Sequence, residues 1–252
     1  MGKVVTLANE KGGVGKTTST ACLAWVLANH HGKKVLAIDF DGQGNLSDIF
    51  CESAKDSESS IFPSLRDNHF QPIQSHGIDI IPGGDSTWLF PDWANEQEDP
   101  STIMLMWLAK HAATEYDFIF IDTPPHLGSI VANAYTAADY LVAVTEPLSF
   151  SYKAIDRMRE TVDILVSEVN PDLKFKILIT KYNGYNRDHE SAKKALNEKY
   201  GDLVLKSVIE RRVSIERLQF LFNQEGVRNK GVLPYLFVAQ EILETSRAEG
   251  GQ

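Results

Sequence analysis

A run of glycines and lysines near the start of the chain has the residue types that bind phosphate. Its three glycines can adopt backbone angles that other residues avoid, so successive N–H groups can point at phosphate oxygens. Lys16 can then reach the β- and γ-phosphates of a nucleotide, and the Thr17 hydroxyl is a magnesium ligand. The alternative to phosphate binding is that these residues form only a glycine turn before a helix. The loop residues assigned to nucleotide binding are Lys11, Gly12, Gly13, Val14, Gly15, Lys16, Thr17 and Thr18.

The segments on either side of this loop are those that phosphate binding requires. The apolar run 4–8 is rich in β-branched residues and predicts a buried strand, and the alanine-rich segment 19–28 predicts a helix. This order places the loop at the positive end of a helix, where anions bind.

The loop itself departs from the ordinary P-loop, because Glu10 stands where that motif has its first glycine. What stands here, K-G-G-V-G-K-T-T, resembles the deviant Walker A motif of the ParA/MinD ATPases. In that family the extra lysine, Lys11 here, reaches across a dimer to the nucleotide of the partner. The resemblance spans nearly the whole chain, is closest to ParA-type partition ATPases, and is weakest over 52–113.

Two further motifs carry this resemblance. D-F-D-G-Q-G-N at 39–45 is similar to the family's D-x-D-P-Q-G-N, with Gly42 in place of proline, and D-T-P-P-H-L-G at 122–128 is similar to D-T-P-P-x-L-G. His126 occupies the variable position, so we interpret it as a surface residue and not as a base. The second motif implies a loop that senses the γ-phosphate.

Acidic residues at the ends of two predicted strands complete the expected site. Asp39 ends the strand 35–39 and Asp122 ends an apolar strand that starts at Tyr116. Loops at the carboxyl ends of parallel strands face the crevice where nucleotides bind, so Asp41 can orient the attacking water. Asp41-Gly42 could instead be only a turn. The predicted metal ligands are Thr17, Asp39 and Asp122, and the predicted catalytic residues are Lys11, Lys16 and Asp41.

Strands and helices alternate along the 252 residues. The alternation predicts an α/β protein with a single-domain P-loop NTPase fold over 1–252, in which helices cover both faces of a twisted, mainly parallel sheet. No N-terminal DNA-reading domain is expected, nor repression of its own operon. We interpret 52–77 as a mobile loop with a short helix. The aromatic stretch 88–100 either packs under a long loop or forms a partner surface.

Basic residues gather in one part of an acidic chain. The net charge is −9, yet 181–230 holds eleven basic and seven acidic residues, so a local DNA-binding patch is possible; a solvated charged face is the alternative. The resemblance places Lys181 and Tyr182 near the adenine. Over 209–217, Glu210 and Ser214 replace a proline and an arginine of the family, which weakens the adenine and DNA contacts implied there. The residues assigned to DNA binding are Lys181, Arg187, Lys193, Lys194, Arg211, Arg212, Arg217, Arg228 and Lys230.

Composition excludes several other classes. No apolar stretch approaches a membrane span and no signal peptide is visible, so a cytoplasmic protein is expected. The two cysteines, Cys22 and Cys51, form no metal pattern and do not supply the pair of an iron–sulfur relative.

The resemblance implies an ATPase that partitions DNA or another cargo, with ATP and Mg²⁺ as cofactors. ATP is preferred to GTP because no guanine-reading N-K-x-D motif occurs. The implied cycle is a nucleoid-associated, ATP-bound homodimer that binds non-specific DNA and is released by hydrolysis, stimulated by a ParB-like or other adaptor. Two alternatives are kept: a MinD-like membrane-cycling ATPase, which the acidic 241–249 disfavours, and a metabolic P-loop enzyme similar to dethiobiotin synthetase.

Overall fold

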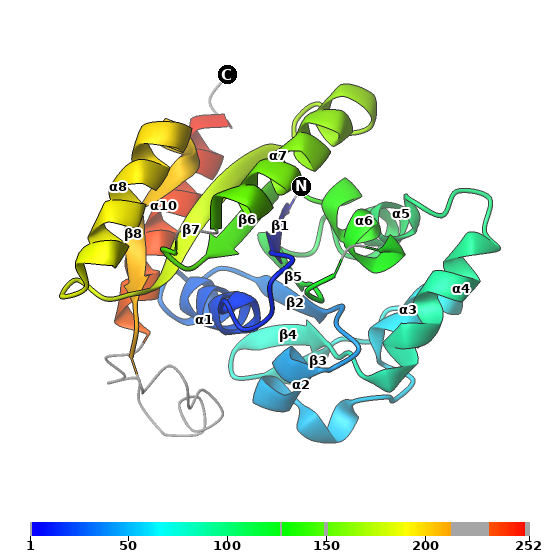
Figure 1. Cartoon of the computed structure of the whole chain (residues 1–252). Helices are drawn as coiled ribbons and strands as arrows, with labels where there is room; N and C mark the ends of the chain where they lie inside the picture. The colour runs from blue at the N-terminus through cyan, green and yellow to red at the C-terminus, as the bar shows by residue number, and fades with distance from the viewer. Residues whose placement is uncertain (1, 127, 149–150, 213–231, 250–252) are drawn as a thin grey trace.

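The computed structural model of the chain describes residues 2–126, 128–148, 151–212 and 232–249, and eight of its segments form one sheet (Figure 1). The strands are β1 Lys3–Ala8, β2 Val35–Asp39, β3 Ile73–Ser75, β4 Ile78–Ile81, β5 Phe118–Asp122, β6 Tyr140–Thr145, β7 Lys174–Tyr182 and β8 Val204–Glu210. Their order across the sheet is β3-β4-β2-β5-β1-β6-β7-β8, and every pair is parallel except β3–β4.

Helices pack on both faces of this sheet. They are α1 Lys16–Asn29, α2 Asn45–Phe50, α3 Ile61–Arg66, α4 Phe90–Asn95, α5 Ile103–His111, α6 Ser129–Thr136, α7 Ser151–Glu168, α8 Arg187–Tyr200 and α10 Leu233–Glu249, with short 3-10 turns η1 Glu52–Ala54, η2 Asp85–Leu89 and η3 Gly201–Leu203. Apolar side chains of α1 and α10 share one buried cluster with the sheet. Side chains of α3 to α8 form two clusters on the opposite face.

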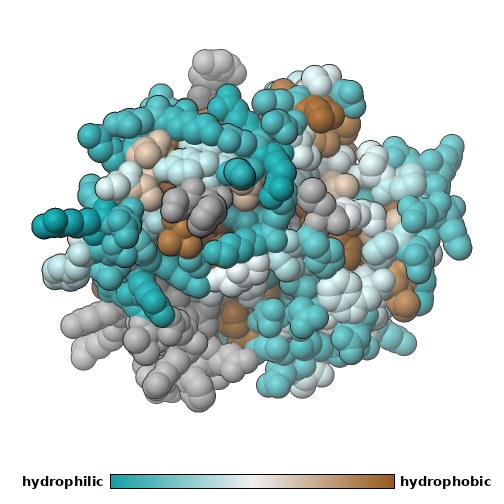
Figure 2. All heavy atoms as spheres, viewed as in Figure 1, coloured by the Kyte–Doolittle hydropathy of each residue, from teal (hydrophilic) through white to brown (hydrophobic). Residues whose placement is uncertain are grey.

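The central strands are buried along their whole length, which explains their continuous apolar sequences. Every residue of β2, β5 and β6 is buried, including the acids that end β2 and β5. On the face seen in Figure 2, hydrophilic residues cover most of the surface over α8, and hydrophobic residues form small separate patches. The alternating fold predicted from the sequence is confirmed.

The sequence interpretation was incomplete between β2 and β4. The predicted loop and short helix over 52–77 contain η1 and α3, but also the antiparallel edge strand β3, which was not predicted. Three residues are too few to show a strand period, and β3 depends on pairing with β4 through the turn at His76 and Gly77. At 88–100, Trp93 packs against Phe62 and Phe90 as expected for packing under a loop, whereas Trp88 is 38% exposed.

Candidate nucleotide site

The glycine loop joins β1 to α1 at the carboxyl end of the sheet. Gly13 and Gly15 have φ values of 74° and 97°, in the left-handed region that favours glycine. Gly15 lies directly before α1, and no side chain caps the first turn of that helix. Its free N–H groups and positive dipole are therefore available to an anion.

Lys16 lies back over this loop and is only 7% exposed. Its Nζ donates to the carbonyl oxygens of Asn9 at 3.1 Å and Lys11 at 3.4 Å. Burial lowers the pKa of Lys16, and the charges of Asp122 and Asp41 act in the opposite direction. The ammonium is thus held inside the loop, beside the two acids, where it can contact a bound phosphate.

Asp122, at the end of β5, is fully buried next to Asp39 at the end of β2, its partner in the strand register. Burial raises the pKa of Asp122 to about 8 and the Asp39 charge adds to this effect, while a hydrogen bond from Thr17 opposes it. One carboxylate oxygen, Oδ2, has no hydrogen-bond partner within the described residues. An orphaned buried oxygen beside a threonine hydroxyl suits a divalent cation, so these residues fit magnesium.

Asp39 is placed differently from a free metal ligand. Its Oδ2 accepts from the Ser47 N–H at 2.8 Å and the Ser47 hydroxyl at 2.7 Å, and its Oδ1 accepts from the Asp41 N–H at 3.3 Å. Burial raises the pKa of Asp39 to about 6, against the lowering effect of Ser47. Asp39 therefore holds the following loop in place as well as lying near the predicted metal.

Asp41 is 5% exposed and lies close enough to Lys16 to affect its pKa. Its carboxylate accepts from the Gln43 N–H at 3.0 Å and its carbonyl accepts from the Gly44 N–H at 2.9 Å, so Asp41 starts a turn. The turn and the functional interpretations of Asp41-Gly42 are therefore compatible, because the turn is what brings this carboxylate to the site.

Two side chains outside the glycine run fix the loop to the sheet, and the sequence analysis gave neither a role. The Asn9 amide donates to the Val144 carbonyl at 2.7 Å and accepts from the Lys11 N–H at 2.8 Å. The Thr180 hydroxyl contacts the carbonyls of Val14 at 2.7 Å and Thr145 at 3.2 Å. Both are buried polar residues inside or at the end of strands, which is the signal that could have identified them.

Lys181 lies at the phosphate loop. Its Nζ donates to the Gly13 carbonyl and forms an ion pair with Glu146 at 3.0 Å. Its φ of 51° is unusual for a residue with a side chain. Tyr182, which the resemblance also placed near the adenine, donates its hydroxyl to Glu190, and the Lys193 Nζ lies 5.2 Å from the centroid of its ring.

A cavity of about 60 Å³ opens beside Gly15 and Thr18 at the start of α1. Its remaining lining residues are Thr180, Lys181, Ile209, Glu210, Arg211, Arg212 and Tyr235. Tyr235 belongs to α10, is 1% exposed, and its hydroxyl lies 3.1 Å from the Ser19 hydroxyl. This cavity adjoins the phosphate loop, and the sequence analysis had given α10 no part in the site.

The two unusual residues of the loop, Glu10 and Lys11, face outward. Lys11 is exposed. Glu10 forms an ion pair of 2.7 Å with Arg157 of α7, which explains how an acid is tolerated where other P-loops have glycine. Lys11 therefore lies at the surface of the chain, beside the phosphate loop.

Among the described residues assigned to DNA, Lys181, Arg211 and Arg212 line one cavity. Arg187, Lys193 and Lys194 lie on α8, whereas Lys181 contacts the phosphate loop. Arg211 and Arg212 line the cavity beside the loop, and Arg212 pairs with Glu210 at 2.9 Å. Arg217, Arg228 and Lys230 lie outside the described residues.

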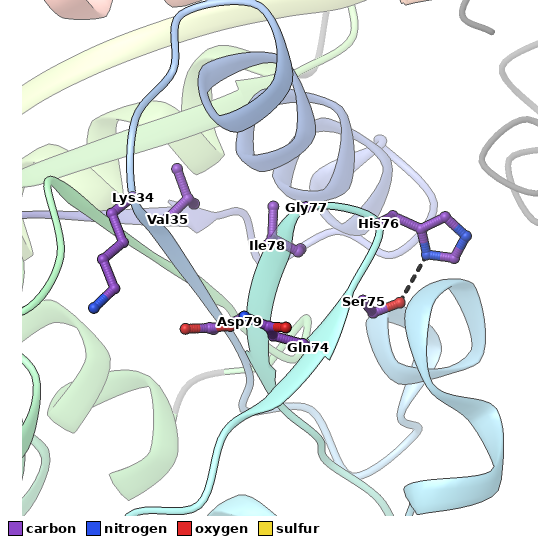
Figure 3. Close-up of a pocket in the computed structure, with 8 residues that line it drawn as sticks. All are labelled: Lys34, Val35, Gln74, Ser75, His76, Gly77, Ile78 and Asp79. Atoms are coloured by element: carbon purple, nitrogen blue, oxygen red, sulfur yellow. Dashed lines mark hydrogen bonds between the residues drawn. The ribbon is translucent and has the colours of Figure 1, made fainter. Parts of the chain in front are cut away.

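A second hollow, of about 360 Å³, lies at the amino ends of the strands, where β2 and β4 begin (Figure 3). Asp79 is one of its lining residues and accepts a hydrogen bond from Tyr116 at 2.7 Å. It is distant in the fold from the carboxyl ends that hold the glycine loop and the buried acids.

The sheet order, the loop and the buried carboxylates together define a P-loop nucleotide-binding protein. Comparison with known proteins then gives the family: the AAA_31 profile, an AAA domain, matches residues 2–175. The sporulation initiation inhibitor protein Soj of Bacillus subtilis is 28% identical over 96% of this chain and 98% of its own length. The chain belongs to the ParA/MinD-type partition ATPase family, which confirms the family inferred from the three motifs.

Solved structures agree with this assignment. A plasmid partition protein from Borrelia burgdorferi bound to AMPPNP is 25% identical over 97% of this chain and 100% of that chain, with a TM-score of 0.82. Cobyrinic acid a,c-diamide synthase from Mycobacterium smegmatis, solved with ADP and magnesium, has a TM-score of 0.81 at 23% identity, with coverage of 99% and 97%. The second likeness shows the fold alone. ATP and Mg²⁺, the cofactors predicted here, are consistent with those ligands.

The membrane alternative is not favoured by the last helix. One side of α10 packs into the core through Tyr235 and Val238, which are 1% and 0% exposed. Among the described residues, no helix is both long and apolar enough to span a bilayer.

Proposed function

We propose that the chain hydrolyses ATP with Mg²⁺ and that the ATP-bound form is a homodimer that binds duplex DNA without sequence preference. The observation that carries the catalytic part is the meeting of Lys16, Thr17 and the orphaned oxygen of Asp122 in one buried site. Thr17 and Asp122 would hold magnesium, which would offset the phosphate charge. Lys16 would bind the β- and γ-phosphates, and Asp41 would orient the attacking water.

Dimerisation would rest on Lys11, which is exposed at the rim of the loop. In a face-to-face dimer each Lys11 would reach the nucleotide of the other subunit, so the site would be complete only in the pair. A single chain would therefore turn over slowly, and a ParB-like adaptor would accelerate it. This arrangement would also bring two copies of α8 into one assembly, which would raise the effective affinity for DNA.

For DNA, Arg187 and Lys194 are the exposed members of the predicted set on α8. The Lys194 side chain is 75% exposed and its ion pair with Glu198 is long, at 3.8 Å, so phosphate could replace the acid at little cost. Binding of this kind would place the protein on the nucleoid when it carries ATP. The affinity would fall steeply with salt, with a log–log slope of about −0.9 for each phosphate neutralised.

The test is a salt titration of binding to unrelated duplexes, with ATP and with ADP. We expect tight binding with ATP only, and a shallower salt slope for Lys194→Glu. Lys110→Glu is the matched control, because this substitution makes the same change of charge on α5, in another part of the surface. Equal affinity for DNA with ATP and with ADP, or no binding even at low salt, would contradict the proposal that the ATP-bound dimer binds DNA.

A further inference from the structure

An aromatic side chain touches both loops that flank the buried acids. Trp88 of η2 lies over Gly42, in the loop after β2, and its ring stacks on His126, in the loop after β5. The ring centroids of Trp88 and His126 are 5.7 Å apart with an interplanar angle of 18°. Asp41 directly precedes Gly42, so one indole joins the loop of Asp41 to the loop that follows Asp122.

The contact at Gly42 requires glycine for space and not for backbone angle. A Cβ atom at this position would lie 2.1 Å from Cε2 and 2.4 Å from Nε1 of Trp88, far inside van der Waals contact. The φ of Gly42 is outside the left-handed region, so any residue could adopt the backbone. Gly42 and Trp88 are therefore matched to each other, because the Cβ of any other residue at position 42, proline included, would collide with the indole.

The same loop and η2 are tied together a second time by residues 55 and 56. Lys55 donates to the Gln43 carbonyl at 3.1 Å and pairs with Asp48 at 2.9 Å. Asp56 accepts from the Ser86 N–H, in η2, at 2.7 Å. The segment that carries Trp88 is thus fixed relative to the loop of Asp41 on two sides.

Core packing does not explain this arrangement, because Trp88 is 38% exposed and His126 is exposed as well. Trp107, by contrast, is 4% exposed within a buried cluster. A large indole left at the surface between two loops of the site gains less from burial than one in the core. Its position relates instead to the loops that it joins.

We propose that Trp88 is a positioning residue for hydrolysis, which holds the Asp41 loop against the loop after β5 through Gly42 and His126. The proposal rests on the proposed ATPase function. Without the indole, the Asp41 loop would keep its turn and the hydrogen bond from the Phe40 N–H to the Asp122 carbonyl at 3.0 Å, but would lose the aromatic contact that joins it to His126. The contacts of Lys16 within the phosphate loop do not involve Trp88 and would remain.

The expected result for Trp88→Ala is a split between turnover and binding. A displaced water-orienting group lowers kcat, by about 10- to 100-fold for a shift of about 1 Å, whereas KM and the Kd for nucleotide should stay within about 3-fold of the parent. Gly42→Ala should have the same effect, because its methyl group would displace the ring. Leu89→Ala is the matched control in η2, since Leu89 is 58% exposed, and it should leave kcat unchanged.

The decisive comparison is the double variant Gly42→Ala/Trp88→Ala. If the two residues act through one contact, kcat of the double variant should equal that of Trp88→Ala, because the collision no longer exists. Losses that multiply in the double variant, or a Trp88→Ala protein with parental kcat, would overturn the proposal.

A readout that does not need turnover keeps this proposal separate from the proposed function. Thermal unfolding of the parent, both single variants and the double variant forms a cycle in which Gly42→Ala should destabilise the protein only when Trp88 is present. If the parent itself hydrolyses no ATP, the proposed function fails and this cycle decides the contact. A coupling indistinguishable from zero in the cycle would overturn the role of Trp88.

Discussion

Replacing Lys16 and Lys11 in turn separates binding within a subunit from contact across a dimer. Lys16 is 7% exposed and two of its three ammonium hydrogens are directed at the Asn9 and Lys11 carbonyls, which leaves one for a phosphate oxygen. A buried charge-assisted contact of this kind contributes about 3 kcal/mol, so Lys16→Ala should weaken ATP binding about 100-fold. Lys11 is exposed, and Lys11→Ala should change the monomer's Kd by less than about 3-fold.

The assay has two readouts on the same samples. Titration with a fluorescent ATP analogue gives the Kd, and light scattering gives the molar mass with ATP and Mg²⁺, which should be twice the 28.1 kDa of one chain for the parent. Lys11→Ala should bind nucleotide and remain at 28.1 kDa. A Lys11→Ala protein that still dimerises with ATP would refute the cross-dimer role, and a Lys16→Ala protein with the parental Kd would refute the site.

Three further predictions concern other contacts. Asp41→Ala should leave ATP binding intact, slow turnover by about 100-fold or more and accumulate the ATP-bound dimer; phosphate release at the parental rate would show that Asp41 is misassigned. Glu241→Ala should lower the free energy of unfolding by about 2 kcal/mol, because this carboxylate accepts hydrogen bonds from two backbone N–H groups of the edge strand β8, each at 2.8 Å. Urea unfolding measures this free energy, and an unchanged value would show that the two hydrogen bonds do not stabilise the protein. Arg157→Ala should lower the free energy of unfolding by less than about 1 kcal/mol in the same assay, because the Arg157 side chain is 62% exposed in its ion pair with Glu10. A larger decrease would mean that this ion pair stabilises the phosphate loop.

Short-range patterns predicted most of the fold. The buried strands have continuous apolar sequences, and β1, β2 and β5 occur within two residues of the predicted ranges. β3 was missed because three residues carry no period, and its existence depends on β4. Local sequence therefore predicted the strands with long apolar sequences, but not β3, which forms only by pairing with β4.

The same limit applies to the site. The glycines and lysines of the phosphate loop lie within one short segment of sequence, and Asp122 ends an apolar strand. Both could therefore be identified from residue spacing alone. Tyr235 comes to Ser19 from 216 residues away, and Trp88 of η2 contacts Gly42 and His126, which lie in two other loops. Those contacts depend on how helices pack over the sheet. Lys181 was assigned to both nucleotide and DNA, and its contact with the Gly13 carbonyl places it beside the phosphate loop.

The most direct test of the account is the rate of phosphate release from ATP by the purified chain, with and without Mg²⁺, beside Lys16→Ala. We predict slow release that requires Mg²⁺, is lost in Lys16→Ala and is retained in the exposed-face control Lys110→Glu. No release by the parent under any of these conditions, or equal release by Lys16→Ala, would contradict the assignment of the buried site to ATP hydrolysis.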